Sequence, residues 1–195
     1  MSQVKIGLEI HAQITELESK LFCSCRGNYR DQRPNTNICE TCCGLPGTLP
    51  IINKKAIEYS AMTSVALGCS VPDKIIFYRK NYFYPDLPKN FQITQYNVYG
   101  FSSIGMGGSF ELDDSRKIRI SRIQLEEDPG RIAYLEGGTN VRNSALIDYN
   151  RAGVALIEIV TEPDFTNPKE VRLFLNKLSL TLEHLAVCDT LLEGS

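Results

Sequence analysis

Hydrophobic and polar residues alternate at the start of the chain. The even-numbered positions from 4 to 14 are all apolar, and the odd-numbered positions between them hold Lys5, Gly7, Glu9, His11 and Gln13. A period of two places alternate side chains on opposite faces of a strand. The pattern therefore predicts a half-buried β-strand over residues 4–14, with Glu9 and His11 on its polar face.

Two later segments are also strand-like. In residues 117–127 the apolar phase slips between Ile120 and Ile123, as an inserted bulge residue would cause. Residues 145–160 form a second convincing strand, broken by Gly153. Glycine-rich residues 101–108 suggest a hairpin tip, and Gly137-Gly138 suggests another turn.

Two helices are predicted from capping residues and apolar spacing. Asn53 can cap a helix over residues 53–67, whose apolar or small stripe comprises Ile57, Ala61, Ser64, Val65 and Gly68. Near the end of the chain Asn167, Pro168 and Glu170 form a strong helix start, followed by apolar residues at helical spacing up to Leu185. This last element is predicted to be an amphipathic helix.

Several glycine-linked strands with few helices favour an α+β fold built around a mainly antiparallel sheet. Residues 77–96 alternate aromatic and charged side chains around two prolines, which is typical of an ordered surface or cleft loop. Because the chain contains no repeat and no linker, we expect residues 1–195 to form a single domain.

Composition excludes several classes of protein. Hydrophobic residues make up 43% of the chain and charged residues 23%, which are ordinary values for a globular protein and exclude a disordered or fibrous chain. Lys and Arg total 21 against 23 Asp and Glu, so no broad basic field indicates DNA binding. No apolar run is long enough for a membrane helix, and no signal peptide is evident, so we expect a cytoplasmic protein without membrane contact.

The cysteines are concentrated in one segment. Five of the seven fall between residues 23 and 43, in a stretch too rich in Gly and Pro for regular structure. The two close pairs, Cys23-x-Cys25 and Cys39-x-x-Cys42, are typical of a tetrahedral four-cysteine zinc site with a structural role. Cys43 is an alternative to Cys42, iron is an alternative to zinc, and buried metal-free thiols are the alternative to a metal site.

Acidic residues form a second candidate site. Glu9 and His11 share one strand face and could bind one cation, although a solvated strand face has the same pattern. Glu158 lies in an otherwise buried run, so it needs a cation or an ion-pair partner such as Arg151. In the cluster 126–128 only alternate side chains can enter a shared site.

The segment 79–91 could bind a nucleotide. Its basic residues Arg79, Lys80 and Lys89 could bind phosphate, and the aromatic residues between them could stack on a base, although an exposed mixed loop has the same pattern. The chain contains no P-loop or dinucleotide-binding motif, so a nucleotide would have to be bound in a less common way.

Long motifs identify a related family. The chain resembles the N-terminal catalytic part of the B-type subunits of aspartyl/glutamyl-tRNA amidotransferases. The resemblance rests on six stretches in order: GLEIHAQI (7–14), KLFCSC (20–25), PNTNICETCCGLPGTLP (34–50), RKNYFYPDLPKNFQITQY (79–96), QLEEDPGR (124–131) and DYNRAGVALIEIVTEPDF (148–165). A sister subunit of the archaeal Glu-tRNA-specific enzyme shares the first and last of these, but the NYFYPDLPK and NTN-x-C-x-x-C stretches resemble the B-type subunits more closely.

This resemblance implies a cradle-like catalytic domain and a ligase activity. With ATP and Mg²⁺, such a domain phosphorylates the side-chain carboxylate of Glu or Asp misacylated onto tRNA(Gln) or tRNA(Asn), and ammonia then displaces phosphate. The resemblance also implies two partners, the A-type amidotransferase subunit, which releases ammonia from glutamine, and the small C-type subunit. Which of the two tRNAs is the substrate stays open.

The resemblance also assigns residues. Glu9, His11, Glu127 and Glu158 fall where the family places its metal-binding site, so they are the expected catalytic residues and magnesium ligands. Tyr84, Lys89 and Gln92 lie in the stretch similar to the nucleotide-contacting loop. Cys23, Cys25, Cys39 and Cys42 match the zinc pattern of some family members.

One departure from the family concerns the end of the chain. Residues 193–195 fall inside what resembles the EGS-x-R motif, so we expect the helical and tRNA-binding regions to be absent and a fragment of this kind to be inactive alone. A non-catalytic zinc-stabilised module that binds the amidotransferase partner or tRNA is the main alternative. A kinase or ligase of small molecules is a third.

Overall fold

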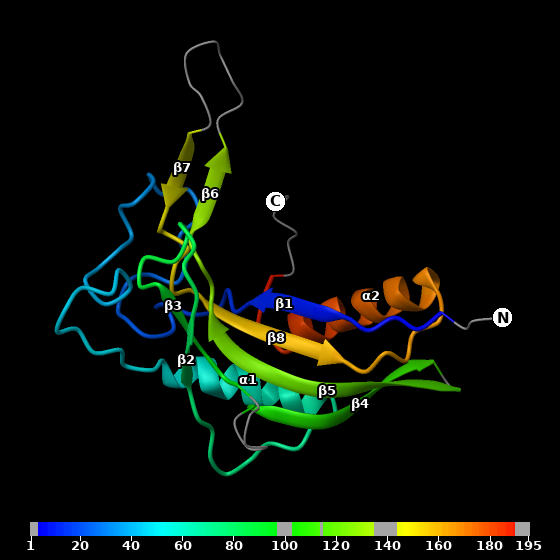
Figure 1. Ribbon diagram of the computed structural model, residues 1–195. Coiled ribbons are helices and arrows are strands. Elements are labelled where there is room, and N and C mark those ends of the chain that lie inside the picture. Colours follow the sequence, from blue (N-terminus) through cyan, green and yellow to red (C-terminus); the bar gives the residue numbers. More distant parts are fainter. Residues whose placement is uncertain (1–3, 97–102, 114, 135–143, 190–195) are drawn as a thin grey trace.

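The computed structural model describes residues 4–96, 103–113, 115–134 and 144–189. Its main sheet contains four strands in the order β1-β8-β5-β4, and every neighbouring pair is antiparallel (Figure 1). The strands are β1 (Glu9–Gln13), β4 (Gly105–Asp113), β5 (Arg116–Glu127) and β8 (Ala155–Thr161). The predicted α+β class with a mainly antiparallel sheet is confirmed.

Two hairpins and two helices complete the described fold. The hairpins pair β2 (Tyr78–Asn81) with β3 (Phe91–Thr94), and β6 (Arg131–Tyr134) with β7 (Ala145–Asp148). The helices are α1 (Lys54–Ala66) and α2 (Pro168–His184). In Figure 1 the β6–β7 hairpin projects away from the main sheet. The helices within the described residues are too short or too polar to cross a membrane.

The apolar phase of the strands explains which face of the sheet is covered. Ile123 and Leu125 of β5 and Ile157 and Ile159 of β8 are almost completely buried, and they share one core with apolar residues of both helices. Phe174 of α2 packs edge-on against two further phenylalanines of this core. The opposite face of the sheet carries the polar residues of the same strands.

The predicted bulge in the 117–127 strand is confirmed. The pairing of β5 with β8 shifts register between Ile120 and Arg122, where the apolar phase slips in the sequence. The predicted first strand is shorter than expected. Only Glu9–Gln13 forms β1, although Ile6 continues the pairing through a bridge to Phe165.

Both helix starts are as predicted, but the buried face of α1 is not. Asn53 and Asn167 each accept backbone hydrogen bonds at their helix N-terminus. Within the predicted stripe of α1 only Ser64 is buried, and Val65 is 67% exposed; the other buried residues of the helix, Ala56, Ser60 and Thr63, lie outside the stripe. Each of the three hydroxyls donates to a carbonyl one turn earlier, so small polar residues can face the sheet at close range.

The segment 77–96 was predicted to be a loop. In the structure its two ends pair as the β2–β3 hairpin, with residues 82–90 as the connection. Tertiary contacts explain the difference: Gln92 donates to the Glu127 carbonyl at 2.6 Å, and Ile93 N–H donates to the Glu127 carboxylate at 2.7 Å. These bonds fix the hairpin against the end of β5. Sequence periodicity contains no information about such partners.

The glycine positions confirm some of the predicted turns and not others. The predicted hairpin tip at 101–108 is wrong for its described part, residues 103–108, since Gly105 and Gly108 lie within β4, which pairs with β5 beyond Asp113. Residues 145–160 form two strands in different sheets, and Gly153 between them has φ +88. The predicted turn at Gly137-Gly138 lies outside the described residues.

Candidate active site and cysteine cluster

The polar face of the main sheet gathers acidic residues from three strands. In the register of the sheet, Glu158 of β8 lies opposite His11 of β1 on one side and Gln124 of β5 on the other. Glu9 is two residues before His11 and therefore points to the same face. Strand alternation thus brings the side chains of residues 9, 11 and 158 together.

His11 lies at the centre of this cluster. Its Nε2 is 3.8 Å from Glu9 Oε1, 3.6 Å from Glu158 Oε2 and 3.6 Å from Glu126 Oε1. Glu9, His11 and Glu158 each offer a ligand atom within 4.8 Å of the others. Carboxylate oxygens suit Mg²⁺, and one imidazole among carboxylates also suits first-row transition metals. The donor set therefore fits a divalent cation.

Burial and charge set the ionisation of these groups. The Glu158 side chain is 9% exposed, and the interaction with His11 is the main cause that holds its pKa below the usual range. The same interaction raises the pKa of His11, and the carboxylates of Glu126 and Glu9 add to this effect. Burial raises the pKa of Glu126. Without a cation, the cluster therefore stabilises a protonated His11.

The structure does not bring Glu127 into this cluster. Adjacent residues of a strand point to opposite faces, so Glu127 lies on the core side of β5, whereas Glu126 lies on the polar side. The Glu127 carboxylate is 2.5 Å from Lys89 Nζ, and both side chains are nearly buried. Sequence reasoning missed Glu126 as a member of the cluster. The sequence did contain this information. Ile123 and Leu125 show which alternate residues of the strand face the core, and Glu126 belongs to the other set.

A cleft of about 460 Å³ lies over the acidic cluster. Basic side chains also line this cleft or the adjoining hollow of about 390 Å³: Lys80, one of the predicted phosphate-binding residues, lines both, Arg151 lines the first, and Arg122, which the sequence analysis did not select, lines the second. Arg122 also lies 3.6 Å from Glu158. Lys80 comes from β2, so its position over the cluster depends on the hairpin that the sequence did not predict.

The three expected nucleotide-contacting residues lie in different places. Gln92 is buried and lines the cleft over the acidic cluster. Lys89 is paired with Glu127 instead. Tyr84 is 52% exposed, and its interaction with Tyr134 raises its pKa. Of the three, only Gln92 is therefore part of this cleft.

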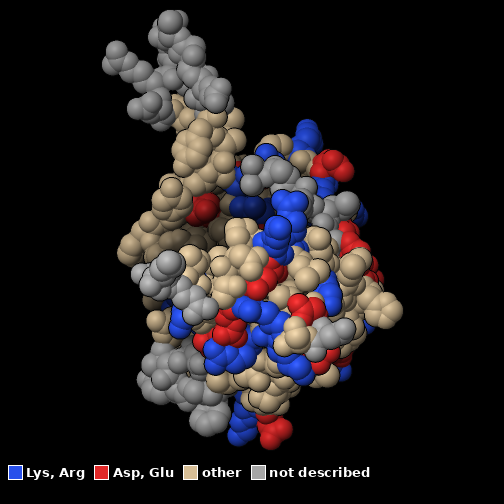
Figure 2. Space-filling view, turned by 90° about the vertical axis from the view of Figure 1, so that its right-hand side faces the viewer, with Lys and Arg blue, Asp and Glu red and all other residues tan. Residues whose placement is uncertain are grey.

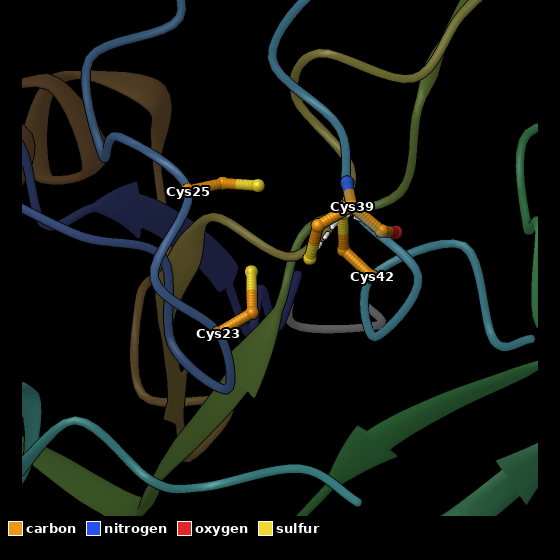
Figure 3. A group of neighbouring side chains, drawn as sticks. All are labelled: Cys23, Cys25, Cys39 and Cys42. Atoms are coloured by element: carbon orange, nitrogen blue, oxygen red, sulfur yellow. Dashed lines mark hydrogen bonds between the residues drawn. The ribbon is translucent and has the colours of Figure 1, made fainter. Parts of the chain in front are cut away.

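The four predicted cysteines converge from two turns of the loop between β1 and α1 (Figure 3). Their sulfur atoms all lie within 4.8 Å of one another, and Cys39 Sγ is 3.8 Å from Cys42 Sγ. A tetrahedron with zinc–sulfur bonds of about 2.3 Å has edges of about 3.8 Å. The donor set therefore fits a four-cysteine zinc site, with Cys42 rather than Cys43 as the fourth member.

Cys42 has the character of a thiolate. Its sulfur accepts hydrogen bonds from the Cys39 N–H at 3.2 Å and from Lys20 Nζ at 3.8 Å. Hydrogen bonding with Cys23 is the main cause that lowers the pKa of Cys42 to about 4, and the same bond raises the pKa of Cys23. Thiolates are the form of cysteine that binds metals.

Charged side chains are intermixed on the molecular surface. Figure 2 shows lysines and arginines beside acidic residues on the face it presents, rather than a field of one sign. Any recognition of a polyanion on this face would therefore depend on local contacts.

Comparison with known proteins decides the family. The GatB/GatE catalytic domain family matches residues 4–195. The chain belongs to this family. It is 50% identical over 192 residues to a Saccharolobus solfataricus protein named as the B-type subunit of aspartyl/glutamyl-tRNA(Asn/Gln) amidotransferase, and 52% identical over 198 residues to a protein of the same name from Methanoregula boonei. The resemblance to the B-type subunits is thereby confirmed.

The matched region is only part of these relatives. The alignments cover 98% and 100% of this chain, but 40% of the length of each relative. Within the GatB/GatE catalytic domain family, the acidic cluster and the four cysteines therefore belong to a region that these longer proteins share with this chain.

Proposed function

We propose that this GatB/GatE-type domain provides the site at which the side-chain carboxylate of Glu or Asp, attached to tRNA(Gln) or tRNA(Asn), is activated by ATP and then amidated. The observation that carries the proposal is the cluster of Glu9, His11 and Glu158 beneath a cleft that Lys80 also lines, in a chain of this family. The names of the relatives support a tRNA-linked amidotransferase reaction.

The chemistry requires activation because a carboxylate is a poor acyl donor. The side-chain carboxylate oxygen attacks the γ-phosphorus of ATP, the bond to the bridging oxygen breaks, and ADP leaves. Ammonia then attacks the carbonyl carbon of the acyl phosphate, and inorganic phosphate leaves with the oxygen that connected it to the acyl group. The products are the amide, ADP and phosphate, so Glu-tRNA(Gln) becomes Gln-tRNA(Gln) and Asp-tRNA(Asn) becomes Asn-tRNA(Asn).

Magnesium would be held by Glu9, His11 and Glu158, with Glu126 beside them. When bound, it would neutralise charge on the phosphoryl oxygens. Lys80, which lines the same cleft, would neutralise further negative charge. Gln92, a predicted nucleotide-contacting residue, offers a further polar group in this cleft.

Zinc has a separate, structural role in this proposal. Cys23, Cys25, Cys39 and Cys42 would supply four thiolates and leave no ligand position for a substrate. The metal would hold a segment that is too rich in Gly and Pro to form regular structure. The proposed partners are the A-type subunit, which supplies ammonia, the small C-type subunit, and the misacylated tRNA.

Substitution in the assembled amidotransferase tests the proposal. Glu158→Gln or His11→Ala should abolish ATP-dependent formation of Gln-tRNA or Asn-tRNA, while glutamine hydrolysis by the A-type partner continues. The exposed residue Glu18, replaced by Gln, provides a matched control that should keep both activities. Product formation at the unsubstituted rate in both variants would refute the assignment. Tight binding of the A-type partner without binding of ATP or Mg²⁺ would favour a non-catalytic, zinc-stabilised binding module.

A further inference from the structure

Lys20 is a lysine that the sequence motifs leave without a role. Its side chain is 1% exposed, which makes it one of the largest fully buried side chains among the described residues. It lies just before the first pair of cysteines, and its backbone N–H donates to the Cys25 carbonyl at 2.8 Å. Lysines are almost never fully buried unless a partner compensates their charge.

The partners of Lys20 lie at the cysteine cluster. Nζ donates to the Asn37 carbonyl at 2.8 Å and lies 3.8 Å from Cys42 Sγ. No carboxylate among the described residues forms an ion pair with it. The Asn37 carbonyl accepts a hydrogen bond but carries no net charge. Of these two partners, only the Cys42 sulfur can therefore carry a negative charge that compensates the ammonium of Lys20.

The backbone around Lys20 leaves room for this approach. A Cβ on Gly153 would lie 3.5 Å from Cys42 Cβ, 3.6 Å from Lys20 Cδ and 3.8 Å from Oε2 of Glu127, a carboxylate that is itself paired with Lys89, so the three side chains meet beside this glycine. Leu21, the next residue, donates its N–H to the Gly153 carbonyl at 2.9 Å. Backbone hydrogen bonds of Lys20 and Leu21 thus fix this segment beside the cysteine cluster.

These observations, together with the proposed zinc site on which the inference rests, give Lys20 a function. Four thiolates around one divalent cation carry a net charge of −2, and this charge would be partly buried. We infer that Lys20 is a positioning residue of the metal site, which compensates part of this negative charge and orients the Cys42 thiolate toward the metal. Groups outside the ligand set that orient metal ligands commonly determine metal affinity.

The test measures metal affinity in the 195-residue chain. Zinc dissociation constants are determined by competition with a chromophoric chelator for the unsubstituted chain, for Lys20→Met, and for Lys74→Met as a control at an exposed lysine. Cobalt replaces zinc in a parallel titration, since thiolate-to-cobalt absorption reports how many thiolates bind. If Lys20→Met does not fold, Lys20→Gln, which retains a donor for the Asn37 carbonyl but no charge, takes its place.

We expect Lys20→Met to weaken zinc binding by about 10- to 100-fold and to change the thiolate-to-cobalt band, whereas Lys74→Met binds as the unsubstituted chain does. Unchanged affinity in folded Lys20→Met or Lys20→Gln would overturn the inference. So would a loss of stability that is equal with and without metal, because Lys20 would then act through packing alone. Failure of the unsubstituted chain to bind zinc or cobalt would instead refute the zinc site itself.

Discussion

Glu126 and Glu127 are neighbours in sequence and yet have different surroundings. The Glu126 carboxylate accepts a hydrogen bond from Thr94 at 2.8 Å and faces His11 on the polar side of the sheet. The Glu127 carboxylate pairs with Lys89 on the core side. Glu126 therefore lies beside the proposed cation site, whereas Glu127 holds the β2–β3 hairpin.

Replacing each glutamate by glutamine should separate these roles. In Glu127→Gln the nearly buried Lys89 ammonium loses its counter-charge, so the free energy of unfolding should fall by about 3 to 5 kcal/mol in denaturant titrations. Glu126→Gln keeps an acceptor for Thr94, so we expect a loss below about 1 kcal/mol. In magnesium titrations, by contrast, Glu126→Gln should weaken Mg²⁺ binding more than Glu127→Gln does. Equal destabilisation by the two substitutions would contradict the geometry.

The sequence indicated the acidic site but not its full membership. Strand alternation placed Glu9 and His11 on one face, and the buried setting of Glu158 indicated a need for a charged partner. Phase alone could also have selected Glu126 over Glu127. Lys80 could not be found in this way, because its place depends on hydrogen bonds between hairpin residues and Glu127 that leave no periodic pattern.

At the scale of elements, the loop of residues 22–50 is held by polar contacts and by the cysteine cluster. Asn37 N–H donates to the Asn150 side chain at 2.8 Å, and Cys43 N–H donates to the Cys39 carbonyl at 3.0 Å. Apart from Phe22 at its start, which packs in the core, the large aliphatic residues of this loop contribute little burial, since Leu45 and Leu49 are exposed. A bound metal would therefore supply the crosslink that a small core cannot provide.

Removing the metal should loosen this loop and leave the sheet intact. After treatment with a chelator, we expect faster hydrogen exchange at the amide of Cys43, while the amide of Ile123 in β5 keeps its protection. Mass spectrometry of exchanged peptides measures both regions in one sample. Unchanged exchange in the loop would contradict a stabilising metal at the cysteines.

A second element, the connection from β8 to α2, is fixed by Asp164. Its carboxylate accepts hydrogen bonds from the Arg119 backbone N–H at 3.0 Å and from Arg119 Nε and Nη2 at 2.9 and 2.7 Å. The Arg119 guanidinium is the main cause that lowers the pKa of Asp164 below its ordinary value. A depressed carboxyl pKa stabilises the fold above the unfolded-state value and loses this effect as the pH falls through the folded-state value.

Asp164→Asn should therefore lower the melting temperature at pH 7 by about 1 to 3 °C, a small effect because solvent screens this pair. The difference from the unsubstituted chain should shrink as the pH falls from about 4, the ordinary pKa of an aspartate, through the lower folded-state pKa of Asp164, below which the carboxyl is protonated in both states. Thermal unfolding at several pH values measures this difference in melting temperature. Asp73→Asn, at an exposed position, is the control. A constant difference from pH 7 to pH 2 would contradict the expected linkage.

Close contact between β4 and the end of α1 requires glycine at position 108. A Cβ there would lie 2.5 Å from the Leu67 carbonyl oxygen and closer still to Cys69 Sγ. Gly108→Ala should therefore reduce the free energy of unfolding by about 1 to 3 kcal/mol in denaturant titrations. Gly7→Ala is the control, since its new Cβ would meet no atom closer than 3.6 Å. Equal stability of the two variants would show that the contact relaxes without cost.

Element type was predictable where capping residues or periodicity were strong. Asn53 and Asn167 begin their helices as predicted, and the phase slip near Ile120 corresponds to a real bulge. The buried face of α1 was not predictable from hydrophobicity, because serine and threonine hydroxyls pair with the backbone of their own helix. The β2–β3 hairpin was missed for a related reason, since polar tertiary contacts replace an apolar pattern.

At the scale of the whole molecule, the two faces of the main sheet differ: one contributes to the hydrophobic core and the other carries the candidate site. One face packs against α1 and α2, and the other carries Glu9, His11 and Glu158 beneath the cleft. The β2–β3 hairpin lies at the end of this sheet in Figure 1 and contributes Lys80 to the cleft. The chain spans 40% of the length of the two relatives compared above.

The central claim is that this cleft activates a tRNA-linked carboxylate with ATP. The most direct measurement is phosphate release from ATP by this chain combined with the proposed A-type and C-type partners, with and without misacylated tRNA. The account predicts release that requires Glu-tRNA(Gln) or Asp-tRNA(Asn) and is lost in Glu158→Gln. Phosphate release that is equally fast without misacylated tRNA, or that persists in Glu158→Gln, would contradict it.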